Sequence, residues 1–255
     1  MSIDGFHSAD QQGLLGYDAE VAVRFYDLVD RVGKRLKVEV EGLENVPAGA
    51  ALLVGNHAFG WDSMLPIAAI STQLARRVWV LGEHAWWRVP FLRRFARAVG
   101  VVDGSQENVT TLLARGELVL VLPGGLREAV KPRELRYQLL WGKRYGFVRA
   151  ALRSQAPIVP LASIGTDELF DFVGNAYSRG RRWLDSALPL PLPARLLPIP
   201  HRVQLRFRFG EPIPCPGGAE PDDFQAVRRL RREVEGALHE LIELELAARC
   251  GIDLG

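Results

Sequence analysis

Short apolar runs alternate with helix-type segments along most of the chain, and this alternation constrains the fold more than any other feature of the sequence. Runs such as "AALLVGN" (50–56) and "APIVPLASIG" (156–165) are bounded by turn residues, as buried strands are. Helix-type segments such as "QENVTTLLARG" (106–116) separate them. This order predicts an α/β fold, a single domain with a largely parallel central sheet flanked by helices. With 255 residues, 48% of them apolar, the chain can enclose a sizeable core. The other predicted strands are 36–42, 78–83 and 117–125, and the other internal helices are 62–76, capped by Asp62, and 145–155.

The start of the chain carries an amphipathic pattern. Residues 18–36 place apolar side chains at steps of three and four, which is typical of a helix that either packs on the core or lies on a membrane. The apolar positions are Val21, Phe25, Leu28, Val29, Val32 and Leu36.

The end of the chain shows a second helical pattern after an alternating stretch. Residues 201–213 alternate as an edge strand does, and the final helix is predicted to begin at Asp222–Asp223. Its expected buried face consists of Phe224, Val227, Leu230, Val234, Leu238 and Leu241. The chain is therefore divided into an N-terminal helical segment (1–40), a core (41–215) and a C-terminal helix packed on the core (216–255).

Charge and cysteine content argue against several classes of protein. The formal net charge is only +2, so no nucleic-acid partner is expected. Cys215 and Cys250 lie far apart without metal-type spacing, and none of the five histidines has a convincing ligand partner, so no metal is expected. No basic and apolar leader opens the chain, and no apolar run reaches the roughly 18 to 20 residues of a spanning helix. We expect a protein without signal peptide or transmembrane helix.

The stretch "VGNHAFGWDSMLP" (54–66) contains the clearest candidate for catalysis. Two residues five apart on one α-helix lie about 140° apart around its axis, so His57 can face Asp62 only from the loop before the helix. There, at the carboxyl end of a strand, Asp62 would accept a hydrogen bond from one imidazole nitrogen and leave the other as a base. Because no G-x-S-x-G nucleophile elbow occurs, the pair is predicted to deprotonate a substrate hydroxyl directly.

A second candidate element is the turn in "VLVLPGGLREAVKP" (119–132). Pro123, Gly124 and Gly125 end a strand and allow the backbone to approach a ligand with its N–H groups outward. Arg127 suits bidentate contact with a carboxylate or phosphate, and Glu128 follows it. The alternative interpretation is a tight strand-to-helix turn with a surface salt bridge.

These elements, in this order, resemble the glycerolipid acyltransferase superfamily, which includes the lysophosphatidic acid acyltransferases. "NHAFGWD" matches the N-H-x4-D motif at Asn56, His57 and Asp62, and "PIVPLA" with Pro160 is similar to the last motif. The middle motif, usually Pro-Glu-Gly-Thr-Arg, reads "PGGLRE", with glycine in place of glutamate. This departure is similar to the branch with mono- and diacylglycerol acyltransferases and plant-type phytyl ester synthases. The resemblance spans roughly residues 45 to 215.

The resemblance implies an O-acyltransferase. His57 would take the proton from an acceptor hydroxyl, Asp62 would orient His57, and the alkoxide would attack an acyl thioester. Substrate-binding roles are implied for Asn56, Pro123, Gly124, Gly125, Arg127, Glu128 and Pro160, with the N–H groups near the two glycines as candidates for the oxyanion. The co-substrate would be acyl-CoA or acyl carrier protein, with no bound cofactor.

Because acyl donors and glycerolipids are hydrophobic, the resemblance implies that the protein binds a membrane or lipid-droplet surface on the cytoplasmic side. Residues 76–100 interleave aromatic and basic side chains, as interfacial segments do, although a core helix with a basic face has the same composition. Residues 181–200 form a proline-broken second candidate, with a packed loop as the alternative. The candidate lipid contacts in 76–100 are Trp86, Trp87, Phe91, Arg93 and Arg94.

A basic cluster after the glycine turn could bind phosphates of coenzyme A or a lysophospholipid, or could be a solvated face. It consists of Lys131, Arg133, Arg136, Lys143 and Arg144.

The sequence is compatible with three functions. The first is acylation of a mono- or diacylglycerol-like or lysophospholipid acceptor. The second is a 1-acylglycerol-3-phosphate acyltransferase, which Arg127 and the basic clusters favour, whereas Gly124 favours a neutral acceptor. The third, from another class, is an inactive lipid-binding protein, against which the intact set of Asn56, His57 and Asp62 argues.

Overall fold

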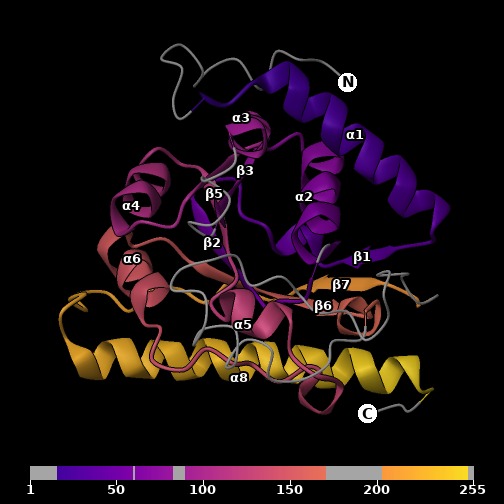
Figure 1. Cartoon of the computed structure of the whole chain (residues 1–255). Helices are drawn as coiled ribbons and strands as arrows, with labels where there is room; N and C mark the ends of the chain where they lie inside the picture. The colour runs from indigo at the N-terminus through magenta and orange to yellow at the C-terminus, as the bar shows by residue number, and fades with distance from the viewer. Residues whose placement is uncertain (1–15, 60, 83–89, 171–202, 252–255) are drawn as a thin grey trace, which may run out of the picture.

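The protein forms one seven-stranded sheet with helices on both faces (Figure 1). The computed structural model describes residues 16–59, 61–82, 90–170 and 203–251. The strands are β1 (Glu39–Glu41), β2 (Ala51–Gly55), β3 (Val78–Gly82), β4 (Val101–Asp103), β5 (Leu118–Val121), β6 (Ile158–Ile164) and β7 (Arg206–Phe209). The α-helices are α1 (Ala19–Arg35), α2 (Trp61–Gln73), α3 (Pro90–Ala98), α4 (Gln106–Ala114), α5 (Gly125–Ala129), α6 (Gly146–Ser154) and α8 (Phe224–Arg249).

The sheet order is β1-β7-β6-β2-β5-β3-β4. Neighbours from β6 to β4 pair in parallel, while β7 runs antiparallel to β6 and parallel to β1. The predicted α/β fold with a largely parallel sheet is confirmed. The prediction of an edge strand in 201–213 is wrong, because β7 has a neighbour on each side. The edge strands are β1 and β4, and β4 was not predicted from the sequence.

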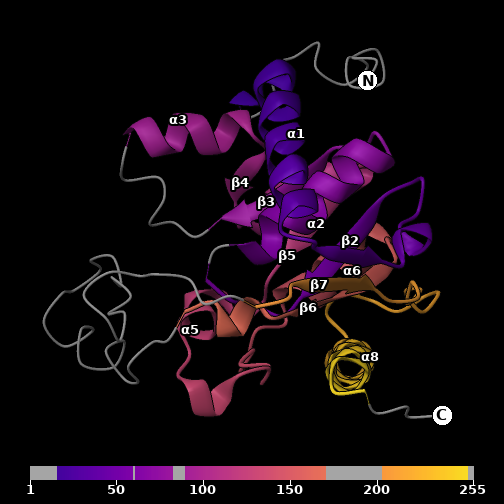
Figure 2. The same ribbon diagram turned by 90° about the vertical axis from the view of Figure 1, so that its right-hand side faces the viewer.

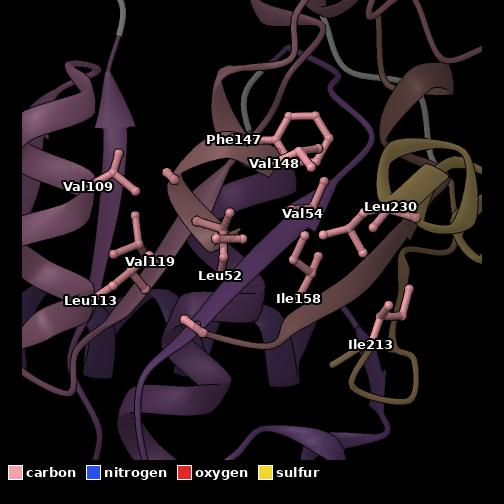
Figure 3. Close-up of a cluster of buried hydrophobic side chains, with 14 of the residues drawn as sticks. Leu52, Val54, Val109, Leu113, Val119, Phe147, Val148, Ile158, Ile213 and Leu230 are labelled. Atoms are coloured by element: carbon pink, nitrogen blue, oxygen red, sulfur yellow. The ribbon is translucent and has the colours of Figure 1, made fainter. Parts of the chain in front are cut away.

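Two apolar cores lie on opposite faces of the sheet. Along β2, Leu52 and Val54 face one core and Ala51 and Leu53 face the other, as the two-residue repeat of a strand requires. Figure 3 shows Leu52 and Val54 beside Ile158 of β6, among side chains from α4, α6 and α8. The other core is closed by α1 and α2. The buried central strands therefore read as continuous apolar runs in the sequence.

Helix α1 packs on the core with a face that only partly overlaps the predicted one. Its buried residues are Ala22, Tyr26, Val29 and Gly33, and a Cβ on Gly33 would lie 3.0 Å from Leu65 of α2. Small residues thus allow α1 to lie close to α2. Of the predicted face, Val29 is buried and Phe25 packs against the core, whereas Val21, Leu28 and Leu36 are exposed, Leu28 at 58%.

Helix α8 lies along the opposite side of the sheet, and Figure 2 looks along its axis. Asp223 caps it as predicted, but Phe224 is 47% exposed and does not belong to the buried face. Glu245 of α8 is buried and pairs with Arg206 and Arg208 of β7 at 2.8 and 3.0 Å. This pairing explains how arginines are tolerated on a strand inside the sheet. In the described part of the chain, no helix combines the length and the apolar character needed to cross a bilayer.

Candidate active site

The loop that follows β2 carries the predicted catalytic residues at the carboxyl end of the strand. Asn56 is fully buried, and its side-chain amide donates to Ser163 O at 2.9 Å and accepts from Ser163 N at 2.8 Å. Both polar atoms of the amide are therefore used to tie the loop to β6. In the structure Asn56 therefore fixes the backbone that presents the next residue, His57, and its predicted contact with substrate stays a prediction.

His57 and Asp62 meet as predicted, with His57 in the loop and Asp62 in the first turn of α2. His57 Nδ1 lies 2.5 Å from Asp62 Oδ2, which also accepts from Ala58 N at 2.8 Å. Helix α2 begins one residue earlier than expected, at Trp61, so Asp62 is not its N-cap. The Asp62 side chain is 1% exposed and that of His57 is 21% exposed. A buried carboxylate thus holds an imidazole that solvent and substrate can reach.

The pKa of His57 is raised above its usual value by its surroundings. Burial alone lowers this pKa, but the charge and hydrogen bond of Asp62, together with the charge of Glu128, outweigh burial, and Lys131 opposes them. The imidazolium that would form when His57 accepts a proton is therefore stabilised. This is the property expected of a general base in such a pair.

Glu128 lies inside the protein beneath the glycine turn. Its Oε1 accepts from His57 N at 2.7 Å and its Oε2 accepts from Leu140 N at 2.6 Å, and the residue is fully buried. A Cβ on Gly124 would lie 2.0 Å from Glu128 Oε2, so only glycine leaves room for this carboxylate. Both carboxylate oxygens are thus occupied by backbone N–H groups, and the predicted role of Glu128 toward a substrate stays a prediction.

Lys131 completes the hold on His57 from the other side. Its Nζ donates to His57 O at 2.9 Å and pairs with Asp167 Oδ1 at 2.8 Å, and the two side chains are 2% and 3% exposed. Asp167, in the short helix Thr166–Glu168, also accepts from Tyr137 N at 2.6 Å. Glu128 and Lys131 thus engage the N–H and the C=O of His57, which fixes the backbone of the residue.

The structure separates one member of the predicted basic cluster from the others. Lys131 is buried and paired. Arg133, Lys143 and Arg144 are exposed, Arg136 is partly buried, and Arg144 donates to Pro123 O at 2.6 Å. Phosphate binding by the exposed members stays a prediction.

The glycine turn leaves few groups for a substrate. Pro123 and Gly124 are buried, and Gly125, with φ of 52°, donates its N–H to Leu122 O at 3.0 Å, so this N–H cannot hold an oxyanion at the same time. Arg127 is exposed and remains the candidate for contact with an anionic group.

Pro160 is the last predicted substrate contact. It is buried in β6 beside Val54, short of the strand's carboxyl end. Its predicted contact with substrate stays a prediction.

Sequence reasoning missed Lys131, Asp167 and Ser163 as parts of the site. Their signal was weak, because a lysine in a basic stretch and an aspartate in "GTDE" look solvated until the fold brings them together. Within the described ranges, no three His, Cys, Asp or Glu side chains gather as a metal site would need. Trp86, Trp87 and residues 181–200 lie outside the described residues, as does the side chain of Phe91, while Arg93 and Arg94 are exposed on α3.

Comparison with known proteins agrees with this geometry. The sequence is 34% identical over 233 residues to an uncharacterized protein of Mycobacterium tuberculosis, covering 86% of this chain and 64% of that protein. It is 32% identical over 206 residues to the mouse "DGAT1/2-independent enzyme synthesizing storage lipids" of Mus musculus, covering 80% of this chain and 59% of that protein. The chain thus spans about three fifths of the length of these relatives.

A solved structure has the same fold. The 1-acyl-sn-glycerophosphate acyltransferase PlsC of Thermotoga maritima superposes with a TM-score of 0.53 at 20% identity, covering 89% of this chain and 82% of that one. The family model described as diacylglycerol acyltransferase matches residues 41–191, more than half of the chain. The sequence-based resemblance to glycerolipid acyltransferases, and to their diacylglycerol acyltransferase branch, is confirmed. The chain belongs to the diacylglycerol acyltransferase family.

Proposed function

We propose that the protein transfers a fatty acyl group from an acyl thioester to the hydroxyl of a glycerolipid. The observation that carries the proposal is the His57–Asp62 pair at the carboxyl end of the parallel strands. His57 Nδ1 lies 2.5 Å from Asp62 Oδ2, the imidazole is partly exposed and the carboxylate is buried. With Nδ1 turned to Asp62, Nε2 remains as the base. Membership of the diacylglycerol acyltransferase family supports the class of reaction.

The proposed step conserves atoms and charge. His57 Nε2 takes the proton of the acceptor hydroxyl while its oxygen attacks the thioester carbonyl, forming a tetrahedral intermediate. Collapse of the intermediate breaks the carbon–sulfur bond and releases the thiolate, which takes the proton back from the imidazolium of His57. Asp62 stabilises the imidazolium throughout, and general base catalysis of this kind is worth roughly 10² to 10⁴ in rate.

The acceptor we propose is a neutral mono- or diacylglycerol-like lipid. Gly124 stands where related acyltransferases carry glutamate, and the space next to it is filled by Glu128. A second candidate is acylation of 1-acylglycerol-3-phosphate, which one observation favours: Arg127 is exposed at the glycine turn, where it can meet a phosphate.

We further propose that the enzyme docks on a membrane or lipid droplet through an α1–α3 surface. Val21 and Leu28 of α1, and its C-cap Leu36, are exposed. The partly buried Phe25 of α1 contacts Phe95 of α3 with ring centroids 5.3 Å apart. Exposed arginines run beside them at the same helical spacing, which suits an anionic interface. The α1–α3 surface comprises Val21, Phe25, Leu28, Leu36 and Phe95, with Arg24, Arg31, Arg35, Arg93 and Arg94.

The test is a search for a new ester. Purified protein is incubated with a long-chain acyl-CoA, or with acyl carrier protein as donor, and a panel of acceptors: monoacylglycerol, diacylglycerol, lysophosphatidic acid, other lysophospholipids and long-chain alcohols. We expect mass spectrometry to show an ester of a neutral glycerolipid. An ester of lysophosphatidic acid alone would select the second candidate. No ester with any donor and acceptor would contradict the proposal and point to a lipid-binding protein without catalysis.

A further inference from the structure

A positively charged hollow lies where α4 and α6 begin, outside the His57 site. It has a volume of about 410 Å³ and is lined by Gln106, Lys143, Tyr145, Gly146, Arg149 and Arg153. Three of these six residues are cationic and none is acidic. Such a lining favours a ligand with negative charge.

The cations of the hollow have no counter-ion in the described part of the chain. Other arginines of the protein, such as Arg77 with Glu117, form close pairs. Across residues 16–59, 61–82, 90–170 and 203–251, no ion pair involves Lys143, Arg149 or Arg153. The charges of these three cations are therefore not neutralised by a described carboxylate, which favours an anionic ligand in the hollow.

Helix α6 adds to the positive potential of the hollow. Its N-cap, Tyr145, makes no side-chain capping bond, so the first N–H groups of this nine-residue helix have no capping side chain, and Arg149 lies in the turn that follows. Arg149 and Arg153 are one helical turn apart, about 6 Å along the axis. The cations therefore form a row that can meet phosphates at more than one point of an extended ligand.

The hollow and the His57 site lie on the same edge of the sheet. Helix α4 follows β4 and helix α6 leads back to β6, so both helices begin at the edge where the parallel strands end. Gln106 Nε2 donates to Gly146 O at 3.0 Å, which joins the two helix starts. Arg144, beside the hollow, donates to Pro123 O of the glycine turn at 2.6 Å. Arg144 thus connects the surroundings of the hollow to the glycine turn.

We propose that the hollow binds the phosphates of the nucleotide end of an acyl-CoA donor. This inference rests on the proposed acyl transfer and assigns its donor. Coenzyme A carries a 3′-phosphate and a diphosphate, which fit a row of cations, whereas a carrier protein's pantetheine arm carries a single phosphate. The thioester end of the same molecule would then reach along the sheet edge toward His57.

The variants Arg149→Gln and Arg153→Gln, alone and combined, test the proposal. Arg115→Gln, an exposed arginine at the far end of α4, is the matched control. The affinity for coenzyme A and for dephospho-coenzyme A is measured by calorimetry, and KM is measured with acyl-CoA and with acyl-pantetheine. Calorimetry uses no turnover, so it tests the hollow even if no ester forms.

We expect each substitution to weaken coenzyme A binding and raise KM for acyl-CoA about tenfold, with kcat and the reaction of acyl-pantetheine unchanged. Dephospho-coenzyme A should bind the wild type more weakly than coenzyme A. Unchanged coenzyme A affinity in the double variant would overturn the proposal, as would an equal loss in Arg115→Gln. Use of acyl carrier protein alone as donor would overturn the assignment to coenzyme A while leaving acyl transfer intact. Absence of any ester with normal coenzyme A binding to the hollow would contradict the acyl transfer but not the site.

Discussion

Two histidine–carboxylate pairs occur in the described structure, and only one has the surroundings of a catalytic pair. His57 and Asp62 lie 2.5 Å apart with the carboxylate 1% exposed. His239 and Glu243 lie 3.0 Å apart on α8, with both side chains 62% exposed. The same chemistry is thus present twice, so residue types alone do not define the site.

The difference lies in the groups around each pair. Glu128 and Lys131 hold the N–H and C=O of His57, and Asn56 ties the preceding residue to β6. His239, by contrast, lies on the exposed side of a helix, four residues from its carboxylate. A pair held in place and shielded from water can keep the geometry that proton transfer requires, which an exposed pair does not do.

The largest expected effect comes from removing the carboxylate of each pair. Asp62→Asn should lower kcat by about 10²- to 10⁴-fold, because His57 loses both its orientation and the charge that stabilises the imidazolium. The matched change Glu243→Gln should leave kcat unchanged. We measure kcat of both variants by steady-state kinetics. Equal losses of kcat would show that the two histidine–carboxylate pairs do not differ in their role.

Breaking the ion pair beneath His57 should make the site less stable. Lys131→Met leaves Asp167 buried without its partner, and we expect a loss of about 3–5 kcal/mol in the free energy of unfolding. Arg24→Met breaks an exposed pair with Glu20, and it should cost less than about 1 kcal/mol. Denaturant unfolding measures both. A small loss in Lys131→Met would mean that the Lys131–Asp167 pair does not support the loop.

Only a few parts of this site could be predicted from the sequence. His57 and Asp62 lie within one short loop, so their spacing and the strand before them sufficed. The roles of Glu128, Lys131 and Asp167 depend on contacts across 71, 74 and 36 positions, the last being the difference between 131 and 167. No local pattern shows that a lysine within a basic stretch is buried.

The fold could be predicted where the signal was local. The prediction failed where the burial of a residue depended on a partner distant in sequence. The central strands are apolar throughout and were recognised from composition. Strand β7, with two arginines, resembled an edge, and its place inside the sheet is explained by carboxylates distant in sequence, Glu245 of α8 and the glutamates of β1. In α1 the packed face contains Ala22 and Gly33, because close approach to α2 favours small residues over large apolar ones.

The pH dependence of activity reports on the charged groups around His57. The dependence of kcat/KM on pH should rise as His57 loses its proton, with a midpoint above the ordinary histidine pKa of about 6.5, because that pKa is raised. Glu128→Gln removes a charge that raises the pKa, so the midpoint should move down. Lys131→Met removes a charge that lowers the pKa, so the midpoint should move up. Shifts in the same direction would contradict the assigned surroundings of His57.

Substitution at the α1–α3 surface is expected to change folding stability least. It should nevertheless weaken lipid binding clearly. Leu28→Ser should reduce binding to vesicles of phosphatidylcholine and phosphatidylglycerol about tenfold. The free energy of unfolding should change by less than about 0.5 kcal/mol, because Leu28 is 58% exposed. Leu244→Ser, at a 42% exposed leucine of α8, is the control in a flotation assay. Equal binding of both variants would reject this surface as the docking site.

The most direct test of the central claim is ester formation in a single turnover by His57→Ala and His239→Ala, beside the wild type. Acyl donor and glycerolipid acceptor are mixed with excess enzyme, and the ester is followed by mass spectrometry after rapid quenching. We expect His57→Ala to fold normally and to lose at least about 10²-fold in rate, while His239→Ala matches the wild type. A folded His57→Ala protein that forms the ester at near wild-type rate would contradict the role of His57 as general base.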